Sequence, residues 1–193
     1  MSSIWRYLNI DNHQLIGDEM YNYLANHTDS LEHRTLSYYY ETDGRQILRH
    51  CPLLVQFLKE RDLDPVVLGI IICSAQRKLG LHIDRDGADP WVRILWPVRN
   101  CQGSRTQFWR VPEGSGELMS NSDNLKYTSF PDHQVKELID EFELTAPVVM
   151  NASVPHSVEA NPDLEDIRIS FTIGFDRDLP VSKSVKAWFG FQR

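Results

Sequence analysis

A succession of short β-branched and aromatic segments, separated by turn-rich pieces, constrains the fold of this chain more than any other feature. The first segment, Val66–Ser74, is a continuous apolar run typical of a strand that is buried on both faces. The later segments are Leu79–Asp84, Val92–Val98, Thr106–Val111, Val148–Ala152, Ser157–Ala160 and Ile167–Phe175. Many short strands in succession predict an antiparallel sandwich or barrel.

Two helices are expected before these strands. Asp11–Gln14 has the form of a capping box, and an apolar stripe follows it. The stripe consists of Leu15, Met20, Tyr21 and Leu24. Pro52 is favoured at a first helical position and predicts a second helix that continues to about Arg61. A further helix is expected at about Gln134–Phe142, and Leu36–Tyr40 has strand-like character.

Helices first and strands afterwards predict a mainly β fold with flanking helices. A double-stranded β-helix (a jelly roll, cupin-like) with N-terminal helices fits this order best. A chain of 193 residues without an internal repeat or a linker is expected to form one domain, 1–193. Its parts would be a helical flank at about 1–64, a jelly-roll core at about 65–176 and a C-terminal extension at 177–193.

The charge and the cysteines restrict the function classes. A net charge of −7 disfavours nucleic acid as a partner. Four arginines in one stretch allow a local basic groove, but solvated arginines on hairpin edges are the preferred interpretation. They are Arg93, Arg99, Arg105 and Arg110. The odd number of cysteines, without Cys-x-x-Cys spacing, indicates neither a disulfide framework nor a structural zinc, and Cys73 is expected to be buried.

The sequence offers no segment that predicts membrane insertion. The longest apolar run, Val66–Cys73, is too short to span a bilayer, and residues 1–6 lack the pattern of a signal peptide. We therefore expect a cytoplasmic protein in a reducing compartment.

Three residues have the spacing of a metal site. His82 and Asp84 lie two apart at the end of a predicted strand, so that their side chains project from the same face. His156 opens a later strand. Two imidazoles and a carboxylate are the donors of Fe(II) sites that keep open coordination positions. Taken alone, the pair His82 and Asp84 would favour a solvated strand end.

The last predicted strand contains Arg168-Ile169-Ser170, twelve residues after His156. Apolar residues alternate there with an arginine and two hydroxyl residues, so that one face is apolar and the other polar. An ordinary half-exposed strand would look similar. In a barrel, however, the polar face would point inward, where a guanidinium binds a carboxylate bidentately and Ser170 adds a hydroxyl donor. The joint pattern is rare by chance in a chain of this composition.

This order of motifs resembles the Fe(II)- and 2-oxoglutarate-dependent oxygenases of the double-stranded β-helix fold. The resemblance covers roughly Val66–Phe175, and the stretch Arg93–Phe108 looks like a segment of small microbial and phage-type members, where an Asn often stands at the position of Leu95. The resemblance implies that Fe(II) is bound by His82, Asp84 and His156. It also implies that Arg168 and Ser170 hold the distal carboxylate of the co-substrate 2-oxoglutarate, and that O₂ is consumed.

The implied reaction is that of a dioxygenase that couples oxidative decarboxylation of 2-oxoglutarate to hydroxylation, or a related C–H oxidation, of a substrate. The carboxylate of Asp84 argues against a halogenase. The substrate, a small molecule or a side chain of a protein partner, is not identified. One alternative is a non-enzymatic jelly-roll binding module or a degenerate metal-binding relative. Another is a cupin-type metal enzyme without 2-oxoglutarate, which has no need of Arg168 and Ser170.

Other candidate residues have simpler explanations. The remaining histidines lack ligand spacing and are expected on the surface or at helix caps: His13, His27, His33, His50 and His133. Ser153 and His156 lack the strand–elbow–helix context of a nucleophile–base pair. Four aromatic residues could line a substrate cleft, but we prefer the interpretation that they occupy alternating core and surface positions of two paired strands: Trp91, Trp96, Phe108 and Trp109. The Gly-, Ser- and Asn-rich segment 113–131 is expected to be a lid over the iron or a plain loop.

Overall fold

The computed structural model describes residues 4–27, 44–65, 67–73, 78–84, 92–120, 126–131 and 136–175. The helices within these ranges are α1 (His13–His27), α2 (Gly44–His50) and α3 (Pro52–Glu60). The strands are β1 (Trp5–Tyr7), β2 (Val67–Cys73), β3 (Lys78–Asp84), β4 (Val92–Arg99), β5 (Arg105–Arg110), β6 (Glu117–Ser120), β7 (Lys126–Ser129), β8 (Glu137–Glu143), β9 (Val148–Asn151), β10 (His156–Glu159) and β11 (Arg168–Phe175). The strand expected at Leu36–Tyr40 and the expected extension 177–193 lie outside the described residues.

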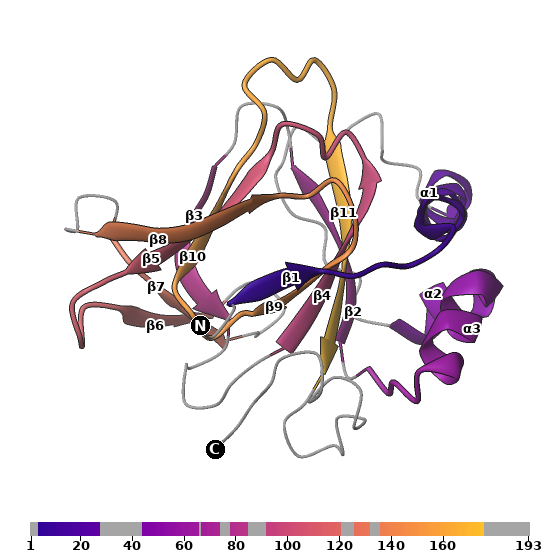
Figure 1. Cartoon of the computed structure of the whole chain (residues 1–193), viewed down its shortest axis with the longest axis horizontal. Helices are drawn as coiled ribbons and strands as arrows, with labels where there is room; N and C mark the ends of the chain where they lie inside the picture. The colour runs from indigo at the N-terminus through magenta and orange to yellow at the C-terminus, as the bar shows by residue number, and fades with distance from the viewer. Residues whose placement is uncertain are drawn as a thin grey trace.

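The strands form two antiparallel sheets that face each other (Figure 1). One sheet has the order β1-β9-β4-β11-β2 and the other the order β6-β7-β3-β10-β5-β8. Strands that are distant in the sequence are neighbours in both sheets, since β11 lies between β4 and β2 and β10 lies between β3 and β5. The predicted mainly β jelly roll with flanking helices is therefore confirmed.

Strand β11 lies inside the first sheet and is buried on both faces. It pairs with β2 from Arg168↔Cys73 to Gly174↔Val67, and with β4 on its other side. Its apolar positions Ile169, Phe171 and Ile173 join the core on the outer side of the sheet. Because side chains alternate along a strand, Arg168, Ser170 and Thr172 project to the opposite side, toward the second sheet. The polar face thus points into the protein and not into water.

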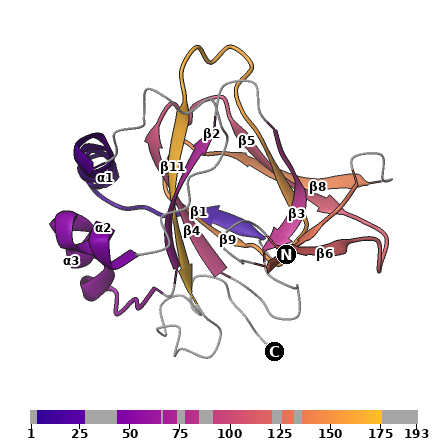
Figure 2. The same cartoon turned by 180° about the vertical axis from the view of Figure 1, so that it is seen from behind.

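The three helices cover the outer face of the first sheet, as Figure 2 shows from behind. Trp96 of β4 is fully buried there; its indole N–H donates to the carbonyl of His13, 3.0 Å away, and its ring meets Phe57 edge-on. Helix α3 begins at Pro52, as predicted, and the Glu19 carboxylate of α1 accepts hydrogen bonds from two of its first backbone N–H groups. No helix in the described ranges is long and apolar enough to cross a membrane.

The apolar stripe expected on α1 is only partly correct. Met20 and Leu24 are buried as predicted, but the Leu15 side chain is 54% exposed, and Ile16 and Tyr23 are buried instead. The helix begins at His13, after Asn12 in a left-handed conformation (φ 59°), and the carbonyl of Asn12 accepts the first backbone hydrogen bond. The face that meets the sheet is therefore rotated relative to the predicted stripe.

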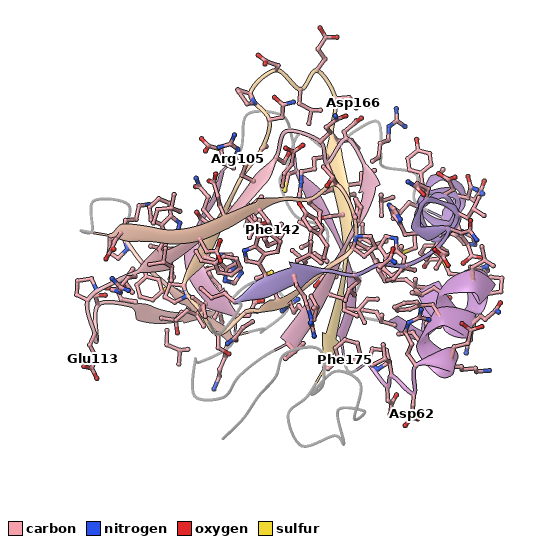
Figure 3. The ribbon with its side chains drawn as sticks, in the orientation of Figure 1. Asp62, Arg105, Glu113, Phe142, Asp166 and Phe175 are labelled. Atoms are coloured by element: carbon pink, nitrogen blue, oxygen red, sulfur yellow. The ribbon has the colours of Figure 1, made fainter. Side chains whose placement is uncertain are left out.

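A second apolar cluster fills the space between the two sheets. Phe142, labelled in Figure 3, packs there against Trp5, with ring centroids 4.9 Å apart, and near Phe108. The other buried members are Leu95, Cys101, Leu144, Val148, Met150 and Ala152. This cluster supports the interior walls of the barrel from which the polar residues project.

The helix predicted at Gln134–Phe142 is wrong, because its residues from Glu137 onward form strand β8. The charged residues there favour a helix locally, but pairing with β5 satisfies the backbone and buries Phe142. Exposed ion pairs join the two strands, Arg105 to Glu141 and Arg110 to Glu137. As the outermost strand of its sheet, β8 carries a charged edge of the kind that discourages further strand pairing.

The segment 113–131 contains a β-hairpin, β6–β7, whose tip at 121–125 lies outside the described residues. Strand β7 pairs with β3, so that Tyr127 lies opposite Asp84 and Ser129 opposite His82. Of the two alternatives, a lid or a plain loop, the plain loop is wrong over the described part, because two strands there extend the second sheet beside the candidate metal residues.

Candidate metal centre

The structure brings His82, Asp84 and His156 together in the middle of the second sheet, where β3 ends and β10 begins. Strands β3 and β10 are adjacent, and His156 is the direct cross-strand partner of His82. One ligand atom from each of the three residues lies within 4.8 Å of the other two. His82 Nε2 is 3.6 Å from Asp84 Oδ1, and the two imidazole centroids are 4.4 Å apart. Such spacing suits a single metal ion with bonds of about 2.0–2.2 Å.

Both imidazoles are held with the same nitrogen toward the centre. His82 Nδ1 lies 2.8 Å from the carbonyl oxygen of Gly80, and His156 Nδ1 lies 2.8 Å from that of Val154. A carbonyl oxygen only accepts, so each Nδ1 must carry the proton and donate. Each Nε2 is therefore the nitrogen directed at the shared space, and the backbone fixes the orientation of each ring.

The electrostatics keep His156 and Asp84 in the forms that bind a metal. Burial, together with the neighbouring His82, lowers the pKa of His156 to about 4, so its imidazole is neutral at pH 7. Burial alone would raise the pKa of Asp84, but Arg93 and the two imidazoles outweigh it and lower that pKa. A neutral imidazole and an ionised carboxylate are the states required of metal ligands.

Arg93 was expected among the solvated arginines, and this interpretation is wrong for that residue. Its side chain is 11% exposed and its Nε lies 2.5 Å from Asp84 Oδ2, so it forms an ion pair across the barrel. Its Nη1 also donates to Thr172 Oγ1 at 3.0 Å. The other three arginines of that stretch are exposed, as expected. The sequence did contain a signal that Arg93 faces the interior: it lies two residues before the inward-facing Leu95 on the same strand, and such residues share a face.

Arg168 and Ser170 lie on the inner face of β11. Arg168 is 2% and Ser170 1% exposed, and Arg168 Nη1 donates to Ser170 Oγ at 3.2 Å. No acidic side chain of the described ranges pairs with Arg168, and its Nε is buried without a hydrogen-bond partner. A buried guanidinium with an unmet donor is costly unless an anion satisfies it. The nearby Cys101 thiol does not do so, because burial raises its pKa even though the charge of Arg168 opposes this.

Apolar and aromatic residues form the walls around these groups. Phe108 is fully buried, opposite His156 in register, with its ring centroid 6.1 Å from that imidazole. The Tyr127 ring approaches His82 edge-on from the hairpin, at 6.5 Å between centroids. Leu95, at the position where an Asn was noted in the resemblance, belongs to the apolar interior cluster. Trp96 faces the helices instead, and Trp91 lies outside the described residues.

Comparison with known proteins identifies a fold and no closer kinship. No protein-family model matches the sequence, and no curated protein matches it. Among solved structures, the non-haem α-ketoglutarate-dependent carbocyclase SnoK of nogalamycin biosynthesis aligns over 90% of this chain and 79% of its own, with a TM-score of 0.53 and 13% identity. The chain thus shares the jelly-roll fold of SnoK.

Two further structures align with lower scores. AviO1 from Streptomyces viridochromogenes covers 90% of this chain and 89% of its own, with a TM-score of 0.48 and 13% identity. A Pseudomonas putida prolyl-4-hydroxylase covers 91% of this chain and 87% of its own, with a TM-score of 0.43 and 14% identity. Neither of these two alignments adds to the argument, and the function must be argued from the residues of the site.

Proposed function

We propose that this protein is an Fe(II)- and 2-oxoglutarate-dependent dioxygenase that oxidises a C–H bond of a small molecule or of a protein side chain. The observation that supports this most strongly is the combination of two sites in one barrel. Ligand atoms of His82, Asp84 and His156 converge within 4.8 Å, and a buried arginine with an unmet donor lies on the facing sheet.

The three converging residues are suited to hold Fe(II). Two imidazoles and one carboxylate form the donor set that is typical of non-haem iron oxygenases, and they leave positions open to other ligands. The backbone carbonyls of Gly80 and Val154 fix the rings, so the Nε2 atoms need little rearrangement to bind. Iron, once bound with 2-oxoglutarate and O₂, would supply the oxidising chemistry that no side chain provides.

Arg168 and Ser170 are suited to bind the distal carboxylate of 2-oxoglutarate. The guanidinium is almost completely buried and points along β11 toward Ser170. Its neighbours link it to the metal residues, because Thr172 on the same inner face contacts Arg93, which pairs with Asp84. A carboxylate bound there would accept a hydrogen bond from the Arg168 Nε, which has no partner among the described groups. It would also accept one from the Ser170 hydroxyl.

Anaerobic titration tests this proposal directly. Addition of Fe(II) and then 2-oxoglutarate to the protein should produce a weak visible metal-to-ligand charge-transfer band. Succinate should accumulate when air is admitted. Asp84→Ala protein, mixed with the same reagents, should give neither signal. If folded native protein binds Fe(II) tightly but shows no band with 2-oxoglutarate, the oxygenase assignment fails and a metal-binding jelly-roll module is favoured.

A further inference from the structure

The two carboxylate oxygens of Asp84 face different partners. Oδ1 lies 3.6 Å from His82 Nε2. Oδ2 lies 2.5 Å from Arg93 Nε. One oxygen of the carboxylate thus approaches the His82 imidazole, and the other is engaged by a guanidinium.

Arg93 is itself fixed in this position. It projects from β4 of the first sheet, whereas Asp84 ends β3 of the second, so that the ion pair joins the two sheets. Its Nη1 donates to Thr172 Oγ1 on the neighbouring strand β11, at 3.0 Å. With one end on Thr172 and the other on Asp84, and with only 11% of its side chain exposed, the guanidinium has little freedom to leave.

We infer that Arg93 is a positioning residue that keeps Asp84 a ligand through one oxygen only. This inference rests on the proposed metal centre. Three single-atom ligands leave about three positions open on a six-coordinate ion. A two-oxygen Asp84 would leave about two, and 2-oxoglutarate, which offers two donor atoms, would fill both. By occupying Oδ2, Arg93 preserves a position for a further small ligand such as water.

A simpler role would be charge compensation, in which Arg93 only neutralises a buried carboxylate. That role predicts that removing Arg93 weakens or destabilises the site but leaves the number of open positions unchanged. The positioning role predicts that the number of metal-bound waters falls while the metal is still held, because Oδ2 becomes a ligand. Bound Mn(II) distinguishes the two, since its effect on water-proton relaxation depends on how many waters it carries.

The experiment compares Arg93→Met with native protein, using Mn(II) as the metal probe, with and without 2-oxoglutarate. We expect Mn(II)-bound waters to fall from about three to about two without 2-oxoglutarate, and from about one to none with it. Arg93→Lys, which keeps a cation beside Oδ2, should restore most of the native relaxation. Arg105→Met is the matched control. Arg105 is an exposed arginine of the second sheet, and it pairs with Glu141 on the neighbouring strand of that sheet.

Native water numbers in folded, Mn(II)-loaded Arg93→Met would overturn the inference while leaving the metal centre intact. If that variant does not fold, Thr172→Val decides, since it removes the anchor of Arg93 but keeps the charge. Loss of bound water in Thr172→Val supports the inference, and native values refute it. Failure of the native protein to bind Mn(II) or Fe(II) would instead overturn the proposed function, and this inference with it.

Discussion

Replacing Arg168 with lysine separates the proposed 2-oxoglutarate pocket from the metal centre. Arg168 is 2% exposed, donates to Ser170 and has a buried Nε without a partner among the described groups. Lysine keeps the charge but cannot form a two-pronged contact with a carboxylate. The loss of one charged hydrogen bond costs about 1.5–3 kcal/mol. We therefore expect 2-oxoglutarate to bind Arg168→Lys about 10- to 150-fold more weakly.

Calorimetric titration of 2-oxoglutarate into Mn(II)-loaded protein without O₂ measures this change. Mn(II) affinity is measured in parallel and should be unaltered, because the three proposed ligands lie on the other sheet. Arg105→Lys, at an exposed site, serves as the control for the substitution itself. Unchanged 2-oxoglutarate affinity, or a loss of Mn(II) binding with 2-oxoglutarate binding intact, would show that the role of Arg168 has been misassigned.

Arg168→Met adds a test of stability. A ligand-binding arginine without an acidic partner contributes little to the free protein, and replacement by an apolar side chain of similar length should be nearly neutral or stabilising. A structural ion pair broken on one side would instead cost about 3–5 kcal/mol. In native protein, 2-oxoglutarate at a hundred times its Kd should add about 2.7 kcal/mol of stability, and Arg168→Met should lose this increment. Chemical unfolding with and without 2-oxoglutarate distinguishes these outcomes.

Four further predictions concern other parts of the molecule. Single alanine substitutions of His82, Asp84 or His156 should abolish tight Fe(II) binding while circular dichroism stays native; native succinate production in any of them would refute the ligand assignment. The pKa of His156 is lowered to about 4, so the unfolded state binds more protons than the folded state between about pH 6.5 and 4. Metal-free protein should therefore lose up to about 3 kcal/mol of stability on acidification through that window. His156→Phe should remove most of this pH dependence in urea unfolding, and an unchanged pH profile in the variant would contradict the buried, neutral state of His156. Cys51 is fully buried and its pKa is raised to about 12, so iodoacetamide at pH 8 should alkylate it only after denaturation, and rapid labelling of native protein would show the environment to be wrong. If 113–131 acts as a lid, its amide hydrogen exchange should slow when metal, 2-oxoglutarate and true substrate are all present, whereas equal exchange in the free and full complexes would make it a passive wall.

The sequence by itself was sufficient to predict seven of the strands and to single out the five candidate residues His82, Asp84, His156, Arg168 and Ser170. Strand positions can be predicted from short stretches of sequence, because β-branched runs and period-two alternation reflect the environment of each residue and its near neighbours. His82 and Asp84 share a face because they lie two apart, and the same holds for Arg168 and Ser170. The predicted strands β2, β3, β4, β5, β9, β10 and β11 accordingly match those of the structure to within two residues.

Features that depend on contacts between distant segments were decided only by the tertiary structure. Residues 137–143 have the composition of a helix, yet pairing with β5 and burial of Phe142 make them a strand. Arg93 resembles the exposed arginines near it in the sequence, but the facing sheet places Asp84 Oδ2 2.5 Å from its Nε. Leu15 and Ile16 are both apolar, and the way α1 packs on the first sheet buries Ile16 and leaves Leu15 exposed. A local pattern records which residues alternate, whereas the partner that each one meets depends on how the two sheets close on each other.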